Sequence, residues 1–243
     1  MSWWHLFSLV LASATGWTAA ALGYLPVAEL RQRVWEPIKV VGAWAVVAAT
    51  APSAVFHWYL IFALICLVAW TKLDRPARKY GLAIAGGLGL SLGLIFPLAL
   101  EPALNAYSNP LVLLSLYLGG AATAFPYVAA LEARAGGILP SAPAQRYAKA
   151  LLLVVLFWAA LIGLEERAIF RMHLGARLLF PDSGSGPAIP SWTPVVPMFA
   201  LLVLAALLAL ATRSGGWRQT QGFGLAAAAT AFVTNLLTQF LLP

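Results

Sequence analysis

Long apolar runs separated by short polar segments dominate the chain. Six runs, at roughly 4–24, 80–100, 109–131, 148–170, 195–212 and 222–242, come close to the length of about 20 residues that a helix needs to cross a bilayer core. In lipid, an unbroken apolar stretch of this length satisfies its backbone hydrogen bonds internally only as a helix. The pattern predicts an all-α, polytopic transmembrane helix bundle that forms a single domain over residues 1–243.

The stretch from 36 to 72 allows two interpretations. It is 37 residues long, which exceeds one ordinary span, and "ATAPSAV" in its middle contains Pro52 and Ser53. These residues either kink one long helix or turn a tight hairpin of two. The first interpretation gives seven spans in the whole chain and the second gives eight.

The positions of Lys and Arg separate the two counts, because cytoplasmic loops carry an excess of both. Eight spans divide the 15 basic residues 12 against 3, whereas seven spans divide them 9 against 6. We therefore expect eight spans with both termini outside, in a bacterial inner membrane. The larger group contains Arg31, Arg33, Lys39, Lys72, Arg75, Arg78, Lys79, Arg134, Arg146, Lys149, Arg213 and Arg218, and the smaller one Arg167, Arg171 and Arg177.

Composition agrees with the membrane class and narrows the partners. The chain is 62% hydrophobic and 9% charged, with ten tryptophans, which is not a balance that a soluble domain needs. Its net charge of +7 is scattered between apolar runs, so we expect no nucleic acid partner. The single cysteine, Cys66, excludes an intrachain disulfide and a thiolate metal cluster. The expected partners are the lipid bilayer and other membrane subunits, with no cofactor.

Two segments are rich in the small residues that let membrane helices approach closely. They are "GLAIAGGLGLSLG" at 81–93 and "GGAATAFP" at 119–126. We expect the fourth and fifth spans, which contain them, to lie inside the bundle, bent at Pro97 and Pro126.

Several polar groups fall near the outer end of their spans. At 1.5 Å per residue, Glu165 and Glu166 lie about 25 Å along the sixth span and Asn235 roughly 20 Å along the last, while His57 begins the third span from outside. This predicts a polar site in the outer leaflet, built by the third, sixth and eighth spans. The alternative is an interfacial charge cluster that ends the sixth span.

The glutamate pair followed by "AIFR" resembles the first motif of the CPBP intramembrane proteases, which include the CAAX prenyl endopeptidases and bacteriocin-processing enzymes. That motif reads Glu-Glu-x-x-x-Arg, whereas Arg171 here follows after four residues. In that family a glutamate activates water, two histidines assist and an asparagine helps form the oxyanion site. The resemblance covers 145–243 and implies Glu165, Glu166, Arg171 and Asn235 as catalytic residues.

The later motifs of the family, Phe-x-x-x-His and His-x-x-x-Asn, are matched incompletely. The corresponding pairs are Phe199 with Val203 and Ala231 with Asn235, so both histidine positions are apolar. The resemblance with these departures implies a catalytically degenerate member of the family. Any remaining enzyme activity would be that of an intramembrane glutamic-type endopeptidase whose substrate the sequence does not name.

Two other function classes fit the same sequence. One is a non-catalytic scaffold or accessory subunit of a larger membrane protein complex. The other is a small transporter with the glutamates as proton-coupling groups, although the sequence shows no internal repeat.

His5, His57 and His173 raise the separate question of a metal or bis-histidine haem site. They lack the i, i+4 spacing that favours either. Histidines at a membrane interface are more often amphipathic surface, so we expect no bound metal.

Overall fold

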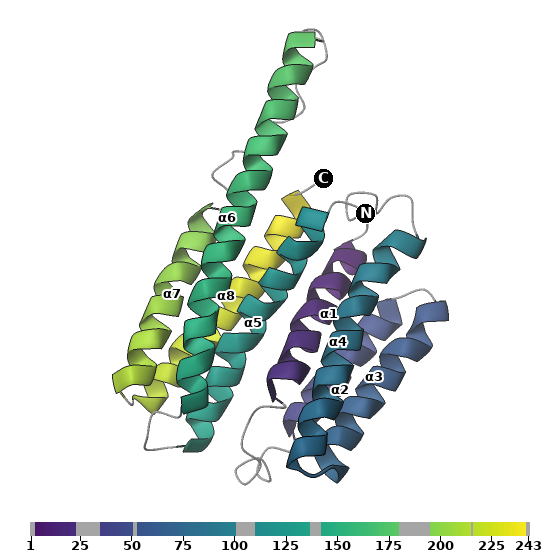
Figure 1. Ribbon diagram of the computed structural model, residues 1–243, viewed down its shortest axis with the longest axis vertical. Coiled ribbons are helices and arrows are strands. Elements are labelled where there is room, and N and C mark those ends of the chain that lie inside the picture. Colours follow the sequence, from purple (N-terminus) through teal and green to yellow (C-terminus); the bar gives the residue numbers. More distant parts are fainter. Residues whose placement is uncertain are drawn as a thin grey trace.

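The computed structural model describes residues 3–22, 35–50, 53–100, 110–136, 142–179, 195–214 and 216–241. Side chains are described for most of these residues, but not for 53–59, 89–100 and 164–179, for His5 and Arg75, or for several residues at helix ends. Every regular element in these ranges is a helix, which confirms the all-α prediction (Figure 1). The helices are α1 (Trp3–Leu22), α2 (Trp35–Thr50), α3 (Ser53–Lys72), α4 (Arg75–Leu100), α5 (Pro110–Gly136), α6 (Ala142–Leu179), α7 (Val195–Ser214) and α8 (Trp217–Leu241).

The ambiguous stretch from 36 to 72 contains two helices. α2 ends at Thr50 and α3 begins at Ser53, next to Pro52, whose missing N–H and fixed φ disfavour a continuous helix. The two helices pack against each other. Both elements of the expected hairpin are therefore present.

Among the residues whose side chains are described, four helices are long and apolar enough to cross a membrane, and they are α5 to α8. Their candidate spans are Val112–Arg134, Ala144–Gly163, Val196–Ser214 and Trp217–Phe240. The described parts of the first three helices give shorter apolar segments, Leu6–Leu22, Ile38–Ala49 and Leu60–Lys72.

Large apolar side chains also cover the outside of the bundle. Phe157 is 69% exposed, Phe199 67% and Leu64 59%, and such surfaces are typical of contact with lipid or another membrane protein. These helices and surfaces indicate a membrane protein.

The helices form two four-membered rings. α1 packs against α2 and α4, and α3 packs against both of these, which closes the N-terminal ring. α5 packs against α6 and α8, and α7 packs against both, which closes the C-terminal ring. α1 joins the rings through α5 and α8, and Figure 1 shows the two groups side by side. The halves thus share one packing order, a likeness that the sequence does not reveal.

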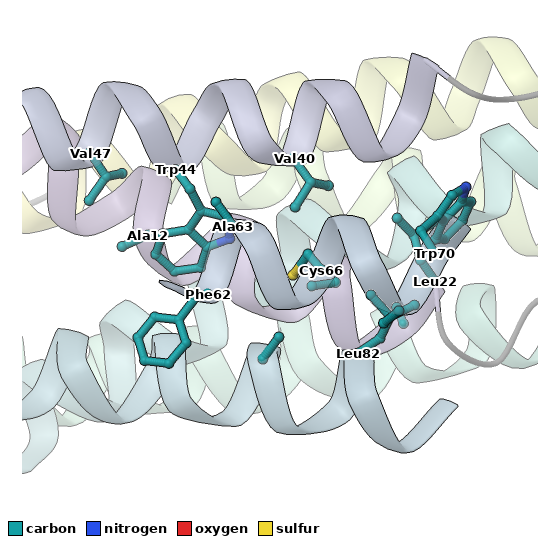
Figure 2. Close-up of a cluster of buried hydrophobic side chains, with 14 of the residues drawn as sticks. Ala12, Leu22, Val40, Trp44, Val47, Phe62, Ala63, Cys66, Trp70 and Leu82 are labelled. Carbon is teal, nitrogen blue, oxygen red and sulfur yellow. The ribbon is translucent and has the colours of Figure 1, made fainter. Parts of the chain in front are cut away.

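Each ring encloses its own apolar core. In the N-terminal ring, Trp44 is fully buried and lies with Phe62, Cys66 and Trp70 among the helices (Figure 2). In the C-terminal ring, Trp158 is fully buried among residues that include Leu151, Leu201 and Leu208 and several alanines.

α5 is the most enclosed of the four candidate spans, with two-thirds of its length buried. This confirms the expected interior position of the fifth span. α4 differs, because Tyr80, Ile84 and Leu88 on its described part are exposed. Only one side of α4 packs into the bundle, where Gly86 meets the carbonyl of Gly16 in α1.

The described Lys and Arg side chains gather at one end of the bundle, which we call the basic end. Here α1, α3, α5 and α7 end, and α2, α4, α6 and α8 begin (Figure 1). The residues concerned are Lys39, Lys72, Arg78, Lys79, Arg134, Arg146, Lys149, Arg213 and Arg218.

Side chains from neighbouring helices bind the terminal carbonyls of three helices at the basic end. Arg78 donates from Nε to the Ala69 carbonyl (3.1 Å) and from Nη2 to the Leu73 carbonyl (3.0 Å). The Tyr147 hydroxyl of α6 donates to the Ala21 carbonyl of α1 at 2.6 Å. Gln145 Nε2 donates to the Thr212 carbonyl of α7 at 3.3 Å. Because the last carbonyls of a helix lack intrahelical partners, these contacts tie the helix ends together.

α6 is longer than the predicted sixth span. It has 38 residues and is therefore about 57 Å long, well beyond a hydrocarbon core of about 30 Å. Its described apolar segment reaches Gly163, the last residue of α6 whose side chain is described, and the helix continues to Leu179, past the other helices, at the end opposite the basic end (Figure 1).

Candidate functional site

The two rings meet at a buried polar contact among α1, α5 and α8. Ser13 Oγ in α1 donates to the Leu116 carbonyl of α5 at 3.0 Å. Asn235 Nδ2 in α8 donates to the same carbonyl at 3.3 Å. Ser13, Leu116 and Asn235 are all buried. We call these three residues, with Gly119 and Gly120, the Leu116 junction.

Two glycines in α5 make the junction possible. A Cβ on Gly119 would lie 2.3 Å from Asn235 Cγ, and a Cβ on Gly120 would lie 2.1 Å from Ser13 Oγ and 2.8 Å from the Ser13 backbone carbon. Real Cβ atoms do not approach other atoms so closely, so α1 and α8 reach α5 only because both positions are glycine. The sequence pair that predicts close packing is therefore where the packing occurs.

The amide of Asn235 is engaged on both sides. Its Nδ2 binds the Leu116 carbonyl, and its Oδ1 accepts from Gln239 Nε2 at 3.4 Å. Gln239 lies one turn further along α8 and is 3% exposed, and its Oε1 is buried without a hydrogen-bond partner. Thr234 and Thr238 donate to carbonyls of α8 itself. Asn235 thus donates to α5 and accepts from its own helix α8, so its amide serves helix packing.

A second buried hydrogen bond shows which residues of α6 and α5 lie at the same height along the bundle axis. Trp158 Nε1 donates to Ser115 Oγ at 3.0 Å, and Ser115 precedes Leu116 in α5. Trp158 and Asn235 therefore contact adjacent residues of α5, at nearly the same level of the bundle. The backbone of Glu165 follows seven residues later in α6, about 10 Å further along the axis.

The glutamate pair lies past the beginning of α5. α5 starts at Pro110, five residues before Ser115 and so about 7.5 Å above it, which is less than the rise to Glu165. The axial separation from Asn235, about two turns, exceeds the sequence estimate, because that estimate counted each position from an assumed membrane boundary. In the structure, the positions of Glu165 and Asn235 along the bundle axis are both measured from the residues of α5 that α6 and α8 contact.

The predicted site residues fall into two groups. Asn235 is buried at the Leu116 junction. Glu165, Glu166 and Arg171 belong to α6, but their side chains lie outside the described residues. The structure therefore does not bring the four together within its described part, and the four-residue site stays a prediction. The side chains of His5, His57 and His173 are also outside the described residues.

The residues aligned with the later family motifs differ in exposure, since those on α7 face outward and Ala231 on α8 is buried. Phe199 and Val203 are 67% and 43% exposed on the outward face of α7, whereas Ala231 is fully buried in the core of the C-terminal ring. Phe199 and Val203 thus face away from the core that contains Ala231.

Ser13 and Glu132 are among the buried polar residues that the sequence analysis missed. Ser13 is hidden in an apolar run, and nothing in its spacing distinguishes it from other serines. Glu132, near the end of α5, is 3% exposed, and a carboxylate within a candidate span is a recognised signal of function or pairing. Among the residues whose side chains are described, no group of three His, Cys, Asp or Glu is arranged to hold a metal ion.

Comparisons with protein-family models, with curated proteins and with solved structures give no match for this chain.

Proposed function

We propose that the chain is a multi-pass protein of a bacterial inner membrane with eight spans and both termini outside, and that it is a non-catalytic scaffold or accessory subunit of a larger membrane complex. In this proposal the CPBP-like features belong to a protein that has kept a protease-like arrangement of helices and has lost the catalytic activity. The bundle supplies a rigid, lipid-embedded body whose outer faces contact partner subunits.

One observation carries the proposal. Asn235, which the resemblance implies as an oxyanion donor, is fully buried and has both sides of its amide engaged by Leu116 and Gln239. An oxyanion donor must point its N–H at the reacting oxygen of a substrate. A residue in this arrangement stabilises helix packing, as interhelical amides do in membranes.

The topology is tested with reporter fusions. A periplasm-dependent phosphatase fused after Pro243 should be active, and the same enzyme fused after Ser214, at the basic end, should be inactive. The reverse orientation would change both results. A third fusion, after Arg33, should be inactive with eight spans and active with seven spans that leave the C-terminus outside.

The scaffold role is tested by photo-crosslinking in native membranes. A photoreactive residue replaces, one at a time, the exposed Leu64, Ile84 and Val233, with the buried Leu201 as control. We expect a crosslink to one reproducible polypeptide from some exposed positions and none from position 201. Crosslinks to lipid alone at every exposed position would contradict the proposal.

The enzymatic alternative is tested in parallel on the purified full-length chain. We expect no peptide cleavage above that of Glu166→Gln and Asn235→Ala variants. Cleavage by the natural chain that both substitutions abolish would establish the protease instead.

The shared packing order of the two rings favours transport as a second candidate, because many transporters consist of two halves related in this way. Transport requires the halves to move relative to each other along α1 and α5. A bifunctional thiol reagent joining Leu9→Cys to Leu113→Cys, two positions of one buried cluster, in a Cys66→Ala background would block such movement. A solute flux that stops on crosslinking would support this candidate over the scaffold.

A further inference from the structure

The outward face of α6 carries exposed apolar side chains and, nearer the basic end, two cationic side chains. Leu153 is 60% exposed, Leu156 55% and Phe157 69%, and Arg146 and Lys149 are exposed nearer the basic end. Spacings of three to four residues place these side chains on one side of a helix. α6 therefore offers an apolar strip that ends in positive charge.

The neighbouring helix α7 repeats this pattern in the opposite chain direction. Phe199, Val203 and Leu210 are exposed along it, and the exposed Arg213 lies in its last turn, at the basic end. α6 and α7 pack directly against each other. The two strips thus run along adjacent helices and end at the same side of the bundle.

One hydrogen bond joins α6 to α7 at the basic end, and we call this part of the surface the α6–α7 corner. Gln145 Nε2 binds the Thr212 carbonyl at 3.3 Å, and the residues that follow these two in the chain are Arg146 and Arg213. The backbones that carry these arginines are therefore neighbours, and Lys149 lies one turn along α6 from Arg146. Arg218 adds positive charge across the α7–α8 turn, where its guanidinium lies 5.2 Å from the ring centroid of Trp217.

No described side chain of α6, α7 or α8 is an Asp or Glu. Glu132 of the neighbouring helix α5 is 3% exposed and so lies inside the bundle, not on this face. The corner between α2 and α3 in the N-terminal ring has Lys39 and Lys72, and the exposed Asp74 follows two residues after Lys72. The α6–α7 corner thus combines three exposed cations with no described acidic side chain on its own helices.

We propose that the α6–α7 face binds an anionic phospholipid of the leaflet at the basic end. The phosphate lies against Arg146, Lys149 and Arg213, and the acyl chains lie along the two apolar strips. Guanidinium groups bind phosphate with paired N–H donors, and basic sites between membrane helices bind acidic headgroups on the cytoplasmic side. This inference goes beyond the scaffold role and does not depend on it.

The test uses the full-length chain in an uncharged detergent, with phosphatidylglycerol and phosphatidylcholine of identical acyl chains as probes and native mass spectrometry as the readout. Each Lys or Arg near an acidic headgroup strengthens binding roughly fivefold. The Arg146→Gln/Lys149→Gln/Arg213→Gln variant should therefore bind phosphatidylglycerol roughly 100-fold more weakly than the natural chain.

The Lys39→Gln/Lys72→Gln variant is the matched control and should bind phosphatidylglycerol as the natural chain does. The charge-conserving Arg146→Lys/Arg213→Lys variant should retain most of the affinity, and circular dichroism checks that each variant keeps its helices. Equal binding by the triple variant and the natural chain overturns the proposal, as does equal affinity of the natural chain for both lipids. A larger loss in the Lys39/Lys72 control than in the triple variant also overturns it.

Discussion

The N-terminal ring packs three buried aromatic side chains, Trp44, Phe62 and Trp70, into its core, whereas the described core of the C-terminal ring contains one, Trp158, and both cores contain seven buried alanines. Bulky aromatic side chains hold helices further apart than alanine does, and the two cores combine these residue types in different proportions. The same order of helices is therefore built with two different fillings, and a ring of four membrane helices does not require one kind of core.

The rings also differ in how well their helices match a bilayer. Within the described residues, α2 is the shortest helix, with 16 residues, whereas every helix of the C-terminal ring has 20 or more. A helix shorter than the hydrocarbon core is accommodated by thinning of the bilayer or by packing against other helices. The N-terminal ring gains such packing from α1, which contacts both α5 and α8. The contact between the rings is therefore expected to matter more to the N-terminal ring.

Replacing Gly120 with alanine tests that dependence most strongly. The new Cβ would lie 2.1 Å from Ser13 Oγ and 2.8 Å from the Ser13 backbone, so we expect a loss of about 3 kcal/mol in the free energy of unfolding. The measurement is thermal or denaturant unfolding in detergent. Gly222→Ala is the control, since no atom lies within 4 Å of its added Cβ. Equal stability of the two variants would mean that the rings separate without cost.

Replacing Arg78 with alanine should weaken the N-terminal ring alone. Arg78 donates to two carbonyls at the end of α3 and lies 5.9 Å from the centroid of the Trp70 ring. We expect a loss of about 2 kcal/mol, measured by the same unfolding experiment. Arg78→Lys should not restore it, because an ammonium lacks the fork of donors. The exposed Arg213→Ala is the comparison and should change stability by less than about 0.5 kcal/mol.

Removing the two donors at Leu116 measures the contact between the rings. Ser13→Ala and Asn235→Ala should each cost about 1 kcal/mol. The double variant should lose about 0.5 kcal/mol more than their sum, because each single variant leaves the carbonyl with one interhelical donor. A double-mutant cycle in unfolding experiments checks this. Strict additivity would show that the two bonds act separately.

Ser115→Ala gives the smallest effect and probes the C-terminal ring. It removes the acceptor of the Trp158 N–H, and interhelical hydrogen bonds in membranes contribute about 0.6 kcal/mol on average. If Ser115→Ala lowers stability by this amount in the natural chain but not in a Trp158→Phe background, the loss is assigned to the hydrogen bond between Trp158 and Ser115. The intrinsic fluorescence of the chain is a second readout, provided that it is compared between variants of equal tryptophan content.

The sequence predicts elements that depend on local chemistry and misses those that depend on distant contacts. Pro52 separates two helices, and the Gly119–Gly120 pair predicts the enclosed position of α5, since both signals lie within a few residues. The closure of the rings rests on contacts such as Ser13 with Leu116, 103 residues apart, which no local pattern encodes. For the same reason the sequence gives the approximate depth of Asn235 but not its partners.

α6 continues beyond the end of the sixth apolar run, 148–170, for a physical reason. Charged residues from Glu165 onward lower the hydropathy of this part of the chain, and the expected span was placed from hydropathy alone. Glu, Arg, Ala, Leu and Met are all strong helix formers, so the helix continues to Leu179 after the apolar segment has ended. Hydropathy reports the membrane boundary, whereas helix propensity sets the length of the helix.

The bond between Ser13 and Leu116 also has a consequence for the order of synthesis. α1 leaves the ribosome first, and its partner carbonyl follows 103 residues later, a delay of roughly 5–20 s at 5–20 residues per second. Asn235 joins the same carbonyl only when α8, the last helix, has been made. The first helix therefore gains its buried polar partner on α5 only after about half of the chain has been made.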